Sequence, residues 1–156
     1  MGMPRDLDLP ALIGALVSAN SRLVRVAATA TGSEESPAVW RTLGVLRDLG
    51  PLRLGELARV SRVTQPTMTK LVNALEERGW VRRTPDPDDG RALRVAAEPA
   101  GLTALDAWRD ELTATIAPMF PELSDDDLAA LERTVAVLQA GLDRADASLG
   151  RSKEHE

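Results

Sequence analysis

Five polar side chains lie close together between positions 65 and 73. They are Gln65, Thr67, Thr69, Lys70 and Asn73. Glutamine and asparagine can pair bidentately with adenine, threonine offers a methyl group to thymine or a hydroxyl to phosphate, and lysine reaches guanine or phosphate. A solvated helix face usually carries alternating charges, whereas this stretch is nearly uncharged until positions 76 and 77. We therefore interpret it as a surface that contacts duplex DNA.

A helix must hold these side chains on one face. Thr64 is a good N-cap, and Pro66 lies in the first turn, where its missing N–H has no cost, so Pro66 joins the outward surface. The inward face repeats at spacings of three and four through Met68, Leu71, Val72 and Leu75. It is expected to pack on a preceding helix whose apolar residues are Leu54, Leu57, Ala58 and Val60. The pattern predicts a helix-turn-helix.

A charged β-hairpin is predicted directly after this unit. Gly79 ends the helix as a left-handed cap, and short, partly alternating segments follow at 80–84 and 92–96. The insert at 85–90 is rich in turn formers. Four arginines surround the hairpin: Arg82, Arg83, Arg91 and Arg94. A basic edge beside the second helix is suited to contacts with phosphate or the minor groove, so the whole unit is typical of a winged helix-turn-helix.

Acidic residues in the hairpin tip have two possible roles. Asp89 lies two residues before Arg91, and we expect its carboxylate to orient that guanidinium by a charge-assisted hydrogen bond. A calcium loop starting at Asp86 is excluded, because the position of the invariant glycine holds Arg91 and that of the closing glutamate holds Ala97.

The segment LGELARVSRVTQPTMTKLVNALEERGWVRR, followed by DPDDGR, resembles the MarR (multiple antibiotic resistance regulator) family of winged-helix transcription regulators. Its specific parts are the Thr-Met-Thr-Lys-Leu-Val run and the Asp-x-Arg of Asp89 and Arg91. The resemblance implies a dimer formed by the first and last helices, a pseudo-palindromic operator, usually repression, and release by a small molecule. The sequence departs from the family pattern where a capping Ser or Thr is common, since it has Arg53 and Glu98 there.

The charge of the chain is divided unevenly. The chain has 156 residues, 44% of them hydrophobic, and a net charge of −5. The segment from Arg53 to Arg94 contains nine Lys or Arg residues and six Asp or Glu residues, a net charge of +3, so the rest of the chain carries −8. An acidic body with a basic reading face would orient the protein on DNA and limit non-specific binding.

Apolar helices are predicted at both ends of the chain. A helix over 10–30 has an apolar stripe, and helices over 36–50, 99–117 and from 124 onward follow the same rule, with Ser36 and Ser124 as caps. Asp125, Asp126 and Asp127 are interpreted as a helix start rather than a metal site. No other domain covers the terminal stripes, so we predict dimerisation through Leu12, Ile13, Leu16, Leu131, Val135 and Leu138. Such stripes can also be intramolecular core.

These elements give a mainly α fold with a small β-hairpin wing. The predicted organisation is an N-terminal dimerisation helix and linker at 1–35, a DNA-binding lobe at 36–98, C-terminal dimerisation helices at 99–147 and a disordered tail at 148–156. No signal peptide or transmembrane run is predicted, because Asn20, Arg22 and Arg25 interrupt the first helix, and the protein is expected in the cytoplasm.

The residues that are missing narrow the signals the protein could sense. The chain has no Cys, which excludes thiol oxidation, and its single His is His155 in the tail, so neither a zinc site nor a cofactor is predicted. A small organic effector remains. The resemblance places its pocket between the dimerisation helices and the DNA-binding lobe, where the candidates are Trp40, Trp108 and Phe120. Ordinary core packing explains these rings equally well.

Two other functional classes are less well supported. An enzyme needs an acid, a base or a nucleophile in a spaced set, and the carboxylates here are explained by helix ends. A winged helix used only for protein contact would present an acidic or apolar face in place of the Gln65 to Asn73 surface. The sequence therefore favours a dimeric DNA-binding regulator, with the protein-interaction module as the alternative.

Overall fold

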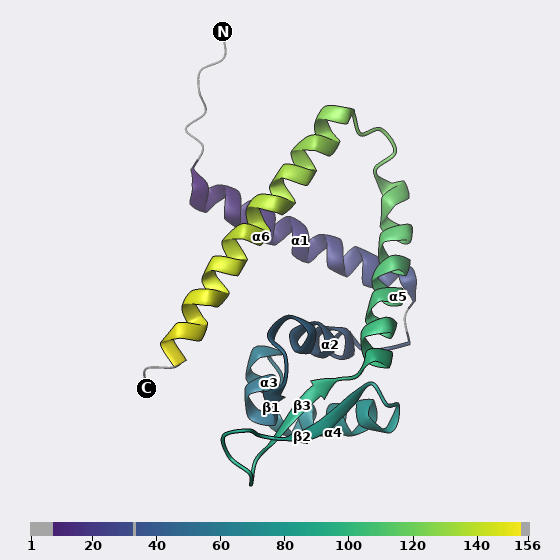
Figure 1. Cartoon of the computed structure of the whole chain (residues 1–156). Coiled ribbons are helices and arrows are strands. Elements are labelled where there is room, and N and C mark those ends of the chain that lie inside the picture. The colour runs from purple at the N-terminus through teal and green to yellow at the C-terminus, as the bar shows by residue number, and fades with distance from the viewer. Residues whose placement is uncertain (1–7, 33, 154–156) are drawn as a thin grey trace. The chain divides into compact units, whose positions relative to one another are not determined.

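The computed structural model describes residues 8–32 and 34–153, and they form helices with one small sheet (Figure 1). The first compact unit runs to Ile116 and contains α1 (Leu9–Thr31), α2 (Pro37–Leu49), β1 (Leu52–Arg53), α3 (Leu54–Val60), α4 (Gln65–Glu77), β2 (Val81–Pro85), β3 (Leu93–Ala97) and α5 (Pro99–Ile116). The second unit begins at Ala117 and contains the 3₁₀ turn η1 (Ala117–Met119) and α6 (Asp125–Lys153). The predicted mainly α fold with a hairpin wing is confirmed.

The sheet is antiparallel, with strand order β1-β3-β2. Val81 pairs with Ala97 across the hairpin, and Leu52 pairs with Val95 on the other side of β3. Both hairpin strands begin one residue later than the sequence predicts. The strand β1 was not predicted, since two residues carry no alternation that could identify them.

The core of the first unit lies where α2, α3 and α4 meet the sheet and α5. Its most deeply buried side chains are Leu43, Leu57, Met68, Val72, Leu75, Val81, Val95 and Leu105. Burying one such side chain stabilises a fold by about 1.5–3 kcal/mol. The predicted inward face of the second helix is confirmed, with Leu71 packed against the cluster from its edge. This core fixes which face of α4 points outward.

The helix ends can be compared with the caps that the sequence predicts. The Thr64 side chain accepts a hydrogen bond from the Thr67 backbone N–H, and Gly79 adopts the left-handed conformation with φ of 71°. Ser124 and Asp127 form the predicted capping box, in which the Ser124 N–H donates to the Asp127 carboxylate at 3.0 Å and the Asp127 N–H donates to the Ser124 hydroxyl at 3.2 Å. Ser36 occupies the predicted N-cap position of α2, although its side chain makes no capping hydrogen bond.

The second unit contains the longest helix. The sequence predicts a disordered tail from position 148, whereas α6 continues to Lys153, so the helix extends further than expected. The last three residues of the predicted tail, including the single histidine, lie outside the described residues.

Gly101 lies in the first turn of α5, directly after the wing. A Cβ atom at this position would lie 2.3 Å from the carbonyl oxygen of Trp80, far inside van der Waals contact. The same carbonyl accepts a hydrogen bond from the Glu98 N–H at 2.9 Å. Only glycine lets the first turn of α5 approach the segment that connects α4 to β2 so closely.

Candidate functional site

The outward face of α4 is open, as predicted. Gln65, Thr67 and Lys70 are exposed, and Thr69 is half-buried. The Thr69 hydroxyl donates to the Gln65 carbonyl at 3.0 Å, and the Thr67 hydroxyl lies 2.8 Å from that of Thr64. These two hydroxyls are therefore engaged within the helix, and their methyl groups and remaining lone pairs are left for a ligand. Pro66 is also exposed in the first turn of the helix.

Asn73 and Arg83 contact each other. The Arg83 guanidinium donates to the Asn73 side-chain carbonyl at 2.6 Å and forms an ion pair with Glu76. Arg83 comes from β2 and its two partners from α4, so this network ties the wing to the recognition helix. Arg82 is paired as well, with its Nε 2.5 Å from a carboxylate oxygen of Glu98. The sequence predicts both arginines as direct DNA contacts, whereas the structure gives each an internal partner.

Arg94 is also engaged, through Asp86. Its Nε donates to the Asp86 carboxylate at 2.9 Å, and one terminal nitrogen lies 3.2 Å from the carboxylate of Asp88. The Asp86 side chain is fully buried and also accepts from the Nε of Arg53 at 2.7 Å. Hydrogen bonds from Arg53, from Arg94 and from the backbone N–H of Asp88 hold the pKa of Asp86 well below its usual range. Asp86 is therefore an anion at neutral pH.

Arg91 differs from the other three wing arginines. Its backbone N–H donates to the Asp89 carboxylate at 3.1 Å, which closes a turn in the tip. Within the described ranges the Arg91 guanidinium has no ion pair and its side chain is exposed. The expectation that Asp89 orients the guanidinium was therefore wrong, because Asp89 shapes the backbone instead. Arg91 remains available to a polyanion.

The sequence analysis did not predict the ion pairs that Arg53, Asp86 and Glu98 form in and beside the wing. Two of them carried a signal, since Arg53 and Glu98 are the positions where the chain departs from the capping pattern of the family it resembles. Neither caps a helix by the expected hydroxyl: the Arg53 side chain makes no cap hydrogen bond and binds Asp86, and Glu98 binds Arg82. Nothing in the sequence distinguishes Asp86 from the other two acidic residues of the same loop, so its ion pairs could not be predicted.

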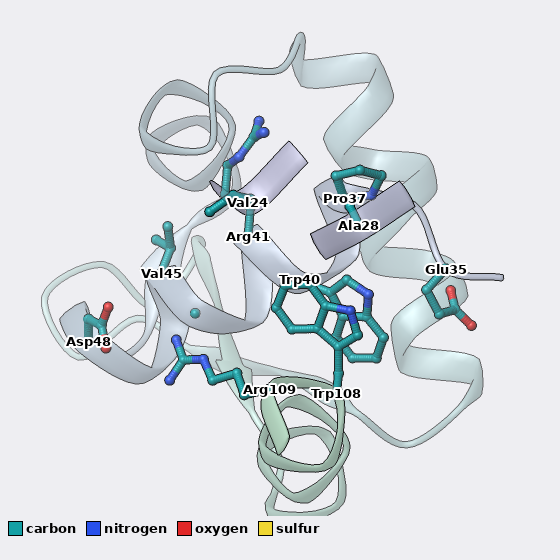
Figure 2. Close-up of a pocket in the computed structure, with 11 residues that line it drawn as sticks. Val24, Ala28, Glu35, Pro37, Trp40, Arg41, Val45, Asp48, Trp108 and Arg109 are labelled. Atoms are coloured by element: carbon teal, nitrogen blue, oxygen red, sulfur yellow. The ribbon is translucent and has the colours of Figure 1, made fainter. Parts of the chain in front are cut away.

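A cavity of about 450 Å³ lies between α1, α2 and α5 (Figure 2). Trp40 and Trp108 stack at its centre with ring centroids 5.0 Å apart, and Val24 and Ala28 contribute from α1. Trp40 and Trp108, two of the three residues predicted for a pocket, both line this cavity. Phe120 belongs to the second compact unit and is not among the residues that line the cavity.

Two contacts connect the cavity wall to the helix-turn-helix. Trp40 also stacks on Trp80, with centroids 5.9 Å apart, and the Arg78 guanidinium lies 5.2 Å above the Trp80 ring at the end of α4. Arg41, which lines the cavity, donates to the Ser61 carbonyl at 3.1 Å in the turn between α3 and α4. The pocket wall therefore contacts the turn between α3 and α4 through Arg41, and it contacts the segment that follows α4 through Trp80.

The terminal helices carry exposed apolar stripes. Leu12 is 45% exposed and Ile13 is 42% exposed on α1, while Leu16 is half-buried. On α6, Leu131 is 53% exposed and Val135 is 52% exposed, while Leu138 is half-buried. By length and composition alone, α1 also passes as a membrane-spanning helix, which is weak evidence for one. Across the part of the chain that the structure describes, no cluster of His, Cys, Asp or Glu could hold a metal ion.

Taken together, a helix-turn-helix with an open polar face and a wing with an exposed arginine define a winged helix-turn-helix. The MarR family model matches residues 36–93, and the chain belongs to the MarR family. The fold agrees with the transcriptional regulator Tm0710 from Thermotoga maritima, with a TM-score of 0.67, 22% identity and coverage of 88% of this chain and 98% of that one. Apo MarR from E. coli gives a TM-score of 0.61 at 22% identity, covering 86% and 98%.

Similar sequences are also regulators. The chain is 38% identical over 97 residues to the HTH-type transcriptional repressor NicR of Pseudomonas putida, covering 62% of this chain and 58% of the relative. It is 26% identical over 99 residues to the HTH-type transcriptional repressor IacR of the same species, covering 64% and 59%. The matches thus span less than two thirds of these relatives.

Proposed function

We propose that the chain is a sequence-specific DNA-binding transcriptional regulator that acts in the cytoplasm, without enzymatic activity, as a homodimeric repressor. The observation that carries the proposal is the outward face of α4, where Gln65 and Lys70 are exposed beside Arg91 of the wing. Short polar side chains in front of a major groove and one unpaired arginine beside a minor groove form a complementary pair of contacts. A protein-interaction module would present an acidic or apolar face there.

Dimerisation is supported by the apolar stripes of α1 and α6. Exposed leucine and isoleucine at Leu12, Ile13 and Leu131 need a partner surface, and a second copy offers the same stripes. Two-fold symmetry would then place half-site centres about 10 base pairs apart, one helical turn. Related DNA-binding proteins of this class read pseudo-palindromes for that reason.

Release by a small organic ligand is supported by the contacts around the cavity. A ligand that fills the cavity would contact Trp40, Trp108 and Arg41, so it would press on the ring stack or compete for the Arg41 guanidinium. The stack ends at Trp80, and Arg41 holds the turn before α4. Occupancy would therefore shift α4 relative to its supports and lower the affinity for DNA.

The DNA proposal is tested by selecting bound fragments from genomic DNA and measuring anisotropy on the selected duplex, with mass determined in solution. We expect a dimer bound to an inverted repeat, and we expect Lys70→Glu to weaken binding strongly. Arg133→Glu on α6 is the charge-matched control, because by helical register Arg133 lies opposite the apolar stripe. A protein that selects no duplex, or equal losses in both variants, would contradict the proposal.

The ligand proposal is tested by filling the cavity from within the chain. Ala28→Phe puts a ring beside Trp40 and Trp108 and imitates an occupant, so operator affinity should fall while the protein stays folded. Ala30→Phe lies on the same helix but does not line this cavity, and it should bind operator normally. Since all three tryptophans belong to the stack, a change in their emission reports the insertion. Normal operator binding by a folded Ala28→Phe variant would contradict the coupling.

A further inference from the structure

Two like charges oppose each other at the base of the wing. Arg53 in β1 and Arg94 in β3 are register partners in the antiparallel sheet. Like charges placed directly opposite destabilise a strand pair unless an opposite charge compensates them. The compensating group is Asp86, whose Oδ2 accepts from the Nε of Arg53 at 2.7 Å and from the Nε of Arg94 at 2.9 Å. One carboxylate oxygen therefore joins both arginines.

This clasp of Arg53, Asp86 and Arg94 fixes three chain segments to one another. Arg53 is the N-cap residue of α3, Asp86 is the first residue after β2, and Arg94 lies on the strand that returns from the tip. The Asp86 side chain has no exposed surface, whereas Arg53 is 50% exposed and Arg94 is 31% exposed. The other Asp86 oxygen accepts from the backbone N–H of Asp88 at 2.9 Å and so sets the first turn of the loop.

Arg53 has no local role at the helix start that it occupies. Its side chain makes no capping hydrogen bond to α3, although Ser, Thr, Asp and Asn are the residues preferred at an N-cap. The guanidinium reaches 33 residues along the sequence to the wing instead. A side chain that gives up a helix cap for a tertiary contact points to a function of that contact.

We propose that Arg53 and Asp86 are positioning residues for DNA binding, which hold the wing at a fixed angle to the helix-turn-helix so that Arg91 reaches the duplex. This inference rests on the proposed function, since it concerns the same DNA contact. With the clasp open, the hairpin would still pair along β2 and β3 and stay linked to α4 through Arg83, but its tip would lose the link to α3 and gain freedom to move. Ordering the tip on DNA would then oppose binding.

The variant Arg53→Ser separates wing position from stability, because serine supplies the missing cap of α3 while the contact to Asp86 is lost. We expect an unchanged or higher midpoint of thermal unfolding and roughly fivefold faster amide hydrogen exchange at residues 88–92 without DNA. Operator affinity should fall several-fold. Unchanged exchange in the wing would overturn the inference. Because exchange is measured without DNA, failure of DNA binding as such gives a different result.

The variant Asp86→Asn separates positioning from direct phosphate contact by the sign of its effect. If Arg53 and Arg94 simply bound phosphates, removing a neighbouring negative charge would raise operator affinity. The clasp predicts lower affinity, because neutral asparagine holds both guanidiniums less tightly. Glu77→Gln is the control, since Glu77 is an exposed acid at the end of α4 outside the clasp, and its neutralisation should leave affinity equal or slightly higher. Higher affinity of Asp86→Asn would overturn the inference.

Discussion

The recognition helix and the wing could both be predicted from the sequence, but their polar side chains differ in the structure: those of the helix are mostly exposed, and most of those in the wing are in ion pairs. On α4 the polar residues Gln65 and Lys70 are exposed where helical register places them. In the wing three of the four predicted arginines are in ion pairs, and Arg91 alone has a guanidinium without one among the described residues. Position along a helix decides exposure locally, whereas the use of a hairpin charge depends on which acids other elements bring near it.

This difference changes which charges matter for binding. The wing loses most of its apparent positive charge to Glu76, Asp86 and Glu98, so the basic edge is smaller than the sequence suggests. The paired arginines hold the wing against α3, α4 and the start of α5. They thereby fix the position of the hairpin whose tip contains Arg91. Specific reading by α4 and anchoring by the wing should therefore be separable by mutation.

The largest expected effect comes from the support that both regions share. Gly101→Ala would bring a Cβ atom to 2.3 Å from the Trp80 carbonyl, between the exit of α4 and the start of the wing. Because the clash is with backbone, we expect destabilisation of about 3 kcal/mol or more, with loss of DNA binding. Urea unfolding measures it, and Gly90→Ala in the wing tip, where a Cβ would meet nothing within 4 Å, is the control. Wild-type stability of Gly101→Ala would show that α5 does not press on Trp80.

The next effect tests reading by α4. Gln65→Ala should relax the preference at particular base positions at a cost of roughly 1–3 kcal/mol if the amide makes a bidentate pair. The measurement is competition binding with single-base operator variants. A uniform loss over all sequences would mean that Gln65 contacts only the DNA backbone, and the comparison between a reading helix and an anchoring wing would fail.

Arg91→Ala tests anchoring by the wing. Operator affinity should fall by about an order of magnitude, since an unpaired arginine near a narrow minor groove interacts with concentrated negative potential. Thermal stability and dimerisation should stay nearly unchanged, because the exposed tip buries little. Asp89→Ala should give a milder loss by loosening the turn that carries Arg91. Unfolding of Arg91→Ala would instead place this residue in an internal ion pair.

The smallest effect is expected at the start of α6. Ser124→Ala removes the hydrogen bond that the Ser124 hydroxyl donates to the Asp127 carboxylate, which lowers the pKa of Asp127, and the one that this hydroxyl accepts from the Asp127 N–H. We expect a loss of about 1 kcal/mol or less in stability, as is typical of an exposed N-cap. Operator affinity per dimer should not change. A large loss of DNA affinity would mean that α6 transmits its state to the reading face.

Much of the fold follows from local sequence, for identifiable reasons. Thr64, Gly79 and the Ser124 capping box act within one turn of chain, so their roles could be predicted. The strand β1 could not be predicted, because two residues are too short to show a pattern. Pairing is harder still. Glu76 lies seven residues from Arg83, but Arg53 lies 33 residues from Asp86, and only the fold brings them together.

The residues that line the cavity could be predicted only in part. The stack of Trp40 on Trp108 joins α2 to α5 and could be suspected from the rarity of aromatic residues. The addition of Trp80, and the exclusion of Phe120 from the lining residues, depend on the tertiary arrangement.

The most direct test of the account is a salt series on one selected operator with Arg91→Ala and Arg82→Ala side by side. Both variants lose one wing arginine, but Arg82 is paired with Glu98 and Arg91 is not. We expect the slope of log affinity against log salt to decrease in magnitude by about 1 for Arg91→Ala and to stay near the wild-type value for Arg82→Ala. Equal slopes in the two variants, or a change in Arg82→Ala alone, would contradict the assignment of Arg91 as the DNA contact of the wing.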